Sequence, residues 1–282
     1  MKLIDSICAP VSALAGGLKT GAGDDRFAFD EAAGWAAVID GATDVGPVRL
    51  FPKAESDAAH YAELFAAALV VHPPGAVETP QSYFSRITVA VRDAAARDAR
   101  VSLADAPASA LPTAAAVWIR ARDGQVEGAS LGDAVAIVRN PDGAIAVFGD
   151  AGKSADEQVR ARKVMAMTPA DRKQWLADAR ATHNRAGGYW IFGVQPEAAA
   201  HVRYQSIPAV PGARILLMTD GFYRLVSPYA VYDDAGLMAA VAARGVGLLF
   251  NELRKLEGDP GDDARIGRFK TSDDATALLV EI

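Results

Sequence analysis

Ala-Ala-Val-Ile-Asp-Gly at residues 36–41 and Arg-Ile-Leu-Leu-Met-Thr-Asp-Gly at residues 214–221 share one design. Each is an apolar run that ends on an aspartate and a glycine, which predicts a buried strand ending in a carboxylate before a sharp turn. The end of the chain reverses this order, because the acidic residues 273–274 precede the apolar residues 277–280. Carboxylates at strand ends from distant parts of a chain can form an all-oxygen site for hard divalent cations.

The composition is that of a globular protein, with 282 residues, 51% hydrophobic and 23% charged. A net charge of -6 and the scattered basic residues argue against nucleic acid as a partner. Cys8 is the only cysteine, which excludes an internal disulfide and a thiolate metal site and is consistent with a cytoplasmic protein. No apolar run approaches the roughly 18 residues that span a membrane, so we expect no membrane partner.

Hydrophobic periodicity and turn residues predict the elements along the chain. The first expected elements are a strand at 2–9, a hairpin at 26–40 that turns around 31–34, and helices at 53–71 and 81–104. Four short strands follow as an antiparallel meander, at 113–120, 126–131, 135–139 and 144–148. The remaining expected elements are a polar helical region at 154–182, strands at 189–194, 201–207 and 214–219, a helix at 233–257, a polar loop at 258–272 and a strand at 275–282.

This order of elements favours an α+β layered fold with antiparallel sheets inside and helices outside. We expect a single domain over residues 1–282, because no linker-like stretch divides the chain. A Rossmann unit is excluded, since no glycine-rich turn joins a strand to a helix in the required register.

Asp-Gly occurs four times in the chain, and the four copies do not have the same context. Asp123 and Asp142 lie between strands of alternating pattern and are typical of plain hairpin turns. Asp40 and Asp220 follow strands that are apolar at consecutive positions, so we expect them to lie near a core.

Six short motifs extend this pattern over the chain. They are residues 23–27 (Gly-Asp-Asp-Arg-Phe), 38–41 (Val-Ile-Asp-Gly), 112–115 (Pro-Thr-Ala-Ala), 131–133 (Leu-Gly-Asp), 217–221 (Leu-Met-Thr-Asp-Gly) and 273–276 (Asp-Asp-Ala-Thr). Their order resembles that of the metal-dependent type 2C serine/threonine protein phosphatases, from about residue 6 to residue 282. The resemblance implies a four-layer α-β-β-α sandwich, with two central antiparallel sheets and the metals in a cleft at one edge.

The resemblance also implies a metal centre of two Mn²⁺ or Mg²⁺ ions. Asp40 would bridge the two ions, and the carbonyl group of Gly41 would be a further ligand. Asp220 and Asp273 would complete one metal site, and Asp24, in place of the family's glutamate, would serve the other. A site of carboxylates and water suits these ions better than Zn²⁺, and none of the four histidines has a paired metal-ligand spacing.

Three further roles follow from the resemblance. Asp25 would hold metal-bound water, and Asp133 would recruit a third, weaker metal. Thr20 stands where many members have an arginine that grips the substrate phosphate, so the neighbouring Lys19 is the candidate substitute, acting only as a point charge. Such departures indicate a divergent member with altered substrate or reduced activity.

Simpler explanations exist for each of these residues. Taken alone, Asp40 and Asp220 are also typical of turns, and Lys19 of a solvated loop. Residues 24–25 are also typical of a solvated turn, Asp133 of a hairpin turn, and residues 273–274 of a loop that caps the last strand. Arg224 is expected at the surface, with a position facing the cleft as the alternative. The basic residues between 160 and 173 are expected on a solvated helix face. A flap-like insertion at 154–194 is the alternative for that region.

The expected function is hydrolysis of phosphoserine or phosphothreonine monoesters by a water that bridges two metal ions. A phosphoprotein is then the substrate, and a cognate kinase is the expected partner. Two alternatives remain open at this point. One is a catalytically weak or inactive regulatory module on the same fold, because the phosphate-gripping arginine is missing. The other is a phosphatase for a small phosphorylated metabolite, because the sequence shows no phosphoprotein-docking surface.

Overall fold

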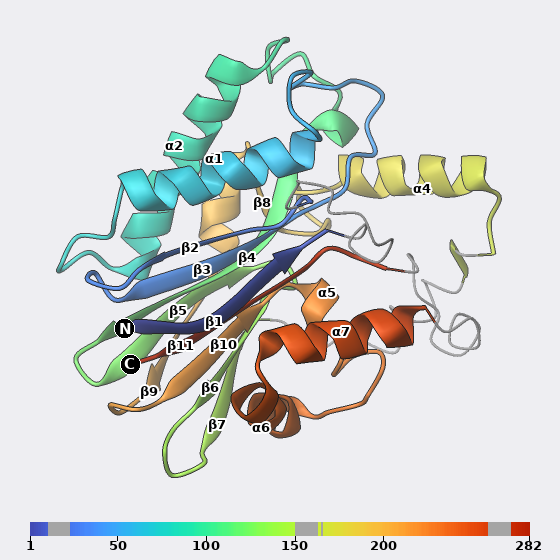
Figure 1. Cartoon of the computed structure of the whole chain (residues 1–282). Coiled ribbons are helices and arrows are strands. Elements are labelled where there is room, and N and C mark those ends of the chain that lie inside the picture. Colours follow the sequence, from blue (N-terminus) through green and yellow to red (C-terminus); the bar gives the residue numbers. More distant parts are fainter. Residues whose placement is uncertain (11–22, 150–162, 165, 259–271) are drawn as a thin grey trace.

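The computed structural model describes residues 1–10, 23–149, 163–164, 166–258 and 272–282 of the chain. Two antiparallel sheets lie face to face, and helices cover the outer face of each sheet (Figure 1). This arrangement confirms the expected α+β fold. No helix in the described ranges is both long enough and apolar enough to cross a membrane.

The first sheet contains both ends of the chain. Its strands run in the order β1-β11-β10-β6-β7. Their bounds are Lys2–Ala9 for β1, Ala275–Glu281 for β11, Arg214–Met218 for β10, Val135–Arg139 for β6 and Ile145–Gly149 for β7. Strand β11 therefore lies between β1 and β10, which places the two apolar segments at 214–218 and 275–281 side by side.

The second sheet contains the hairpin and most of the meander. Its order is β2-β3-β4-β5-β9, and the short strand β8 also pairs with β4. The bounds are Arg26–Asp30 for β2, Trp35–Gly41 for β3, Thr113–Arg122 for β4, Gln125–Leu131 for β5, Phe192–Gly193 for β8 and Arg203–Pro208 for β9. The meander thus divides, because β4 and β5 belong to this sheet while β6 and β7 belong to the first.

Apolar side chains from the facing sides of the sheets form a common core. Val38 and Val117 come from the second sheet, and Leu217 and Leu278 come from the first, all with no exposed surface. The alternate residue Ile39 belongs to a different cluster beneath the helices. Strand β3 is consequently apolar on both faces, which explains its continuous run of apolar residues.

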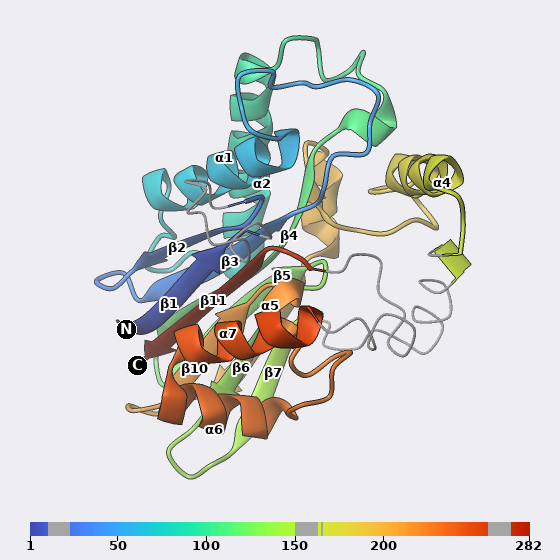
Figure 2. The same ribbon diagram turned by 45° about the vertical axis from the view of Figure 1, so that its right-hand side comes forward.

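Helices cover the two outer faces separately (Figure 2). Helices α1 (Asp57–Val71) and α2 (Pro80–Asp98) lie on the second sheet, where Tyr83, Phe84 and Trp118 form a buried aromatic cluster. Three helices lie against the first sheet, namely α5 (Asp220–Tyr223), α6 (Asp234–Arg244) and α7 (Val246–Glu257). The other helices in the described part of the chain are η2 (Ala108–Ala110), α4 (Pro169–Ala181) and η3 (Pro196–His201).

Two expected helices have other boundaries in the structure. The first begins at Asp57 instead of residue 53, because the Ser56 side chain caps it by accepting a hydrogen bond from the Ala59 amide. The second ends at Asp98 instead of residue 104. Ala99 is extended, and the Arg100 amide donates to the Leu50 carbonyl at 2.9 Å, so a contact with a distant loop ends the helix.

Two further expectations were wrong. The single helix expected at 233–257 is two helices, because Gly245 has φ +80° and ends α6. The strand expected at 189–194 contains only residues 192–193. Asn184 is hydrogen-bonded through its amide to the Tyr189 carbonyl, and its side chain accepts from the Ile191 amide, so these contacts replace a strand ladder. Parts of the regions expected at 154–182 and 258–272 lie outside the described residues.

Candidate metal centre

The candidate metal centre lies where strands of both sheets end. Strand β3 of the second sheet ends at Asp40 and Gly41. In the first sheet, β10 ends just before Asp220, and β11 begins just after Asp273 and Asp274. The Thr219 amide donates to the Thr276 carbonyl at 3.0 Å, which holds these two strand ends together.

Asp40 is the point around which the predicted carboxylates gather. Burial raises the pKa of Asp40 well above its ordinary value, and the carboxylates of Asp25, Asp220, Asp133 and Asp273 raise it further. Five carboxylates from separate parts of the chain therefore share one electrostatic environment. Negative charge concentrated in this way is costly unless a cation balances it.

Asp25 is not part of a solvated turn, since only 1% of its surface is exposed. Its Oδ2 accepts a hydrogen bond of 2.9 Å from the Thr219 hydroxyl group. Burial raises the pKa of Asp25 well above its ordinary value, and the neighbouring Asp274 carboxylate is the next cause. Asp25 is thus fixed in a position that reaches from the second sheet to the ends of β10 and β11.

Asp24 connects the same edge to the start of α1. Its amide donates to Asp274 Oδ2 at 2.6 Å, and its Oδ1 accepts a hydrogen bond from the Ser56 hydroxyl group. The backbone is also close here, because a Cβ atom on Gly41 would lie 2.5 Å from the Asp24 carbonyl oxygen. Only glycine therefore fits after Asp40, and this leaves the Asp24 and Gly41 backbones in contact.

Arg224 is buried, with 6% of its surface exposed, so the expectation of a surface position was wrong. Its Nη2 donates to Asp273 Oδ2 at 3.0 Å, and its Nη1 donates to Glu257 Oε1 at 3.0 Å. Burial by itself lowers the pKa of the Arg224 guanidinium, but the carboxylates of Asp273, Asp220 and Glu257 outweigh it and raise the pKa. Arg254 belongs to the same network, because it donates hydrogen bonds to the Glu257 carboxylate and to the Asp273 carbonyl group.

Asp274 and Ser56 were not identified as parts of this site from the sequence, and for Arg224 the position at the cleft was only the alternative to a surface position. Members of the family that the sequence resembles have asparagine at the position of Asp274. The aspartate here could therefore have been recognised as a further carboxylate of the site. Ser56 could have been recognised as a helix cap but not as a partner of Asp24. Lys19 and Thr20 lie outside the described residues.

The donor chemistry at this edge fits a hard divalent cation. All the side-chain donors are carboxylate oxygens, and Arg224 is the cation that pairs with one of them. Within the described ranges, no three His, Cys, Asp or Glu side chains already form a group that could hold a metal ion. The fit therefore rests on the shared edge and on the excess of negative charge, and not on a finished coordination sphere.

Three solved structures illustrate the similarity of the fold. PppA of Pseudomonas aeruginosa, described as a key regulatory component of T6SS, has a TM-score of 0.52 and 17% identity, covering 100% of this chain and 99% of that one. The Mycobacterium tuberculosis serine/threonine phosphatase PstP/Ppp has a TM-score of 0.57 and 13% identity, with the same coverage of 100% and 99%. The catalytic domain of PstP, in complex with two manganese ions, has a TM-score of 0.52 and 15% identity, covering 98% and 96%.

At these identities the structures establish the fold alone. No curated protein sequence matches the chain significantly. The sequence profile of protein phosphatase 2C matches residues 21–248, which is most of the chain and includes Asp24, Asp40, Asp133 and Asp220. The chain belongs to the protein phosphatase 2C family.

Proposed function

We propose that the chain is a metal-dependent phosphatase that hydrolyses phosphoserine and phosphothreonine monoesters in proteins. The observation that carries this proposal is that Asp40 lies partly buried at an edge where strands of both sheets end, and that four other carboxylates act on it electrostatically. Membership of the protein phosphatase 2C family supports phosphate-ester hydrolysis as the chemistry of this edge.

The proposed ligands come from four segments of the chain. Asp40 would bridge two Mn²⁺ or Mg²⁺ ions, with the Gly41 carbonyl as a further ligand. Asp220 and Asp273 would complete one of these sites, and Asp24 would serve the other. When bound, two such ions would lower the pKa of a water between them and neutralise the substrate phosphate.

The remaining residues would orient water and substrate. Asp25, held by the Thr219 hydroxyl group, would orient the water for attack on phosphorus. Asp133 would bind a third, weaker metal, because its carboxylate acts on Asp40 from the end of β5. Lys19 would bind the substrate phosphate as a point charge, and the 154–194 region would act as a flap beside the cleft.

A phosphoprotein substrate is the proposal that the similar structures support. PstP is described as a serine/threonine phosphatase, and PppA as a key regulatory component of T6SS in Pseudomonas aeruginosa. We therefore propose a signalling role in the cytoplasm, in which the chain reverses a cognate kinase.

The proposal is tested by phosphate release from phosphoserine and phosphothreonine peptides and from a panel of phosphorylated metabolites, in Mn²⁺. We expect turnover of the peptides by wild type and its loss in Asp40→Asn. Turnover of one metabolite with no peptide turnover would contradict the protein substrate. A folded wild type that turns over none of them with any divalent ion would point to a regulatory module instead.

A further inference from the structure

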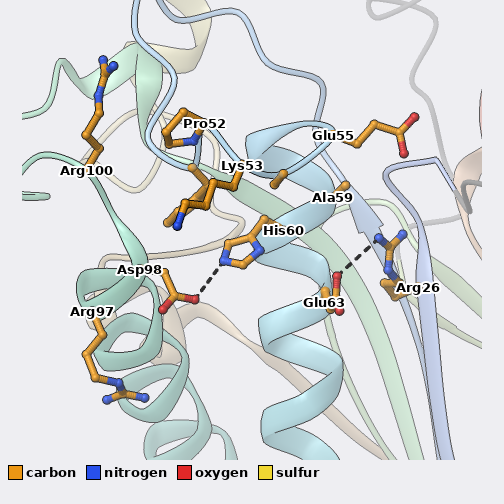
Figure 3. A pocket seen from close by; sticks show the side chains of 12 residues that line it. Arg26, Pro52, Lys53, Glu55, Ala59, His60, Glu63, Arg97, Asp98 and Arg100 are labelled. Carbon is orange, nitrogen blue, oxygen red and sulfur yellow. Dashed lines mark hydrogen bonds and ion pairs between the residues drawn. The ribbon is translucent and has the colours of Figure 1, made fainter.

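The structure contains a pocket of about 900 Å³ outside the candidate metal centre, and Figure 3 shows the residues that line it. It lies between the loop at residues 51–55, the first turns of α1 and the C-terminal end of α2. Arg26 and Glu55 border it. Arg26 donates to the carbonyl groups of Gly23 and Asp25, and the residue after Glu55 is the serine that binds Asp24. The pocket and the metal centre therefore share a wall.

The charges of this pocket are not balanced. Its two internal pairs are His60 with Asp98, joined at 3.0 Å, and Arg26 with Glu63, joined at 3.8 Å. The other charged residues that line it are the cations Lys53, Arg97 and Arg100 and the single anion Glu55. The side chains of these three cations form no ion pair with a described residue. With His60 neutral, as in the net charge of -6 for the whole chain, the four lysine and arginine side chains that line the pocket exceed its three carboxylates by one, so the pocket is slightly positive in an acidic chain.

The positions of the cations indicate the shape of the ligand. Lys53 lies on the same side of the pocket as the His60–Asp98 pair, while Arg26 and Glu55 lie on the opposite side (Figure 3). The guanidinium groups of Arg97 and Arg100 lie at the outer edge and point away from the centre in different directions. A small anion is bound best by donors that converge on one point, whereas spread cations suit several acidic groups along a chain.

The walls of the pocket also suit a polypeptide. The Phe51 ring packs against His60, with 4.5 Å between the ring centroids, and Pro52 and Ala59 add apolar surface. An extended peptide advances about 3.3 Å per residue, so successive side chains of one bound segment can reach cations that are spread along the pocket. The same surface can therefore contact both the backbone and the acidic side chains of one bound segment.

We propose that this pocket is a docking site for an acidic segment of the phosphoprotein substrate, near the phosphorylated residue. The proposal rests on the proposed function, because it places a substrate segment beside the reaction centre. It adds a preference for acidic sequence, which the metal centre cannot supply by itself. Because the three cations are exposed, the contribution of the pocket is expected to weaken with salt.

The test compares two phosphothreonine peptides that differ only in their flanks, with glutamates on both sides in one and glutamines in the other. At low salt we expect the kcat/KM of wild type to be about tenfold higher for the acidic peptide than for the glutamine peptide. The difference should come from a lower KM for the acidic peptide, with the same kcat for both. The triple variant Lys53→Ala, Arg97→Ala, Arg100→Ala is expected to lose this preference. Its turnover of p-nitrophenyl phosphate is expected to stay at the wild-type value, since none of the three residues belongs to the metal centre.

A matched control removes the same charge elsewhere. Lys2, Arg139 and Arg214 are exposed and lie together at the opposite end of the first sheet. The triple variant Lys2→Ala, Arg139→Ala, Arg214→Ala is expected to keep the preference. If both triple variants lost the preference for the acidic peptide equally, the preference would be a general effect of net charge. That result would overturn the proposal that the pocket is a docking site.

Binding of the two fluorescently labelled peptides, measured by anisotropy in chelator, separates this proposal from the catalytic one. Tighter binding of the acidic peptide by wild type, lost in the Lys53, Arg97 and Arg100 variant, supports the pocket even if no phosphate is released. Equal binding and equal kcat/KM for the two peptides would overturn the proposed docking site. Turnover of p-nitrophenyl phosphate in the same experiment would still support the proposed phosphatase activity.

Discussion

Arg224 shows how one residue can change the balance of charges at the centre. It is a buried cation among carboxylates, and it contacts Asp273 and Glu257 at once. The residue was expected at the surface, and a position facing the cleft was the alternative. Burial of an arginine depends on its partners, and Glu257 is 33 residues away in the sequence. Local pattern could therefore not reveal it.

Replacement of Arg224 by glutamine is expected to lower the free energy of unfolding by about 3 kcal/mol. The substitution removes the buried positive charge that balances the negative charges of Glu257 and Asp273. Urea denaturation measures the change. The matched control is Arg214→Gln, which breaks the exposed pair with Glu281 and should cost less than about 1 kcal/mol. Equal effects of the two substitutions would contradict a stabilising role for the buried network.

His183 is expected to make the protein less stable in mild acid. Burial lowers its pKa to about 4, and Arg180 contributes in the same direction. In the unfolded chain the pKa of histidine is about 6.5, so the unfolded state binds a proton first as the pH falls. Stability is therefore lost between about pH 6.5 and pH 4, by about 1–2 kcal/mol after allowance for partial exposure.

The measurement is the free energy of unfolding of wild type and His183→Gln at pH 7, 6, 5 and 4. The difference between the two proteins should change across this range, with the variant losing less stability on acidification. Two parallel curves would show that His183 does not contribute to the acid sensitivity.

At the scale of the elements, periodicity predicted which segments are helices and strands more reliably than where they end. The boundaries that differ are set by single side chains or by tertiary contacts, such as the Ser56 cap and the bond from Arg100 to Leu50. The break between α6 and α7 had a sequence signal, the glycine at 245. It was overlooked because apolar residues continue with helical spacing on both sides of it.

Gly245 is expected to tolerate no side chain. Its φ of 80° and ψ of 158° belong to a region that only glycine adopts freely, and a Cβ atom would lie 3.0 Å from Asp5 Oδ2. Gly245→Ala should therefore destabilise the protein by about 1–3 kcal/mol in thermal or urea unfolding. Two residues later, Gly247 lies inside α7 with open space around it, so Gly247→Ala should be neutral or stabilising by up to about 1 kcal/mol.

At the scale of the whole molecule, the sequence predicted the pairing of strands that are adjacent in the chain, namely β2 with β3, β4 with β5 and β6 with β7, but not which distant strands would be neighbours. The layered α+β fold was predicted from the order of the elements, and the acidic edge from the apolar runs that end on carboxylates together with the resemblance of the six motifs. The division of the meander between two sheets and the position of β11 between β1 and β10 depend on pairing over long sequence separations. Periodicity within one strand carries no information on such partners.

The measurement that tests the central claim most directly is hydrolysis of p-nitrophenyl phosphate by wild type and Asp220→Asn, each with Mn²⁺ and with chelator. The control is Asp142→Asn, which changes an exposed aspartate at a hairpin tip. We expect turnover by wild type and the control only with metal, and a loss of at least about 100-fold in Asp220→Asn. Metal-independent turnover, or equal turnover by wild type and Asp220→Asn, would contradict a metal centre at the edge shared by the two sheets.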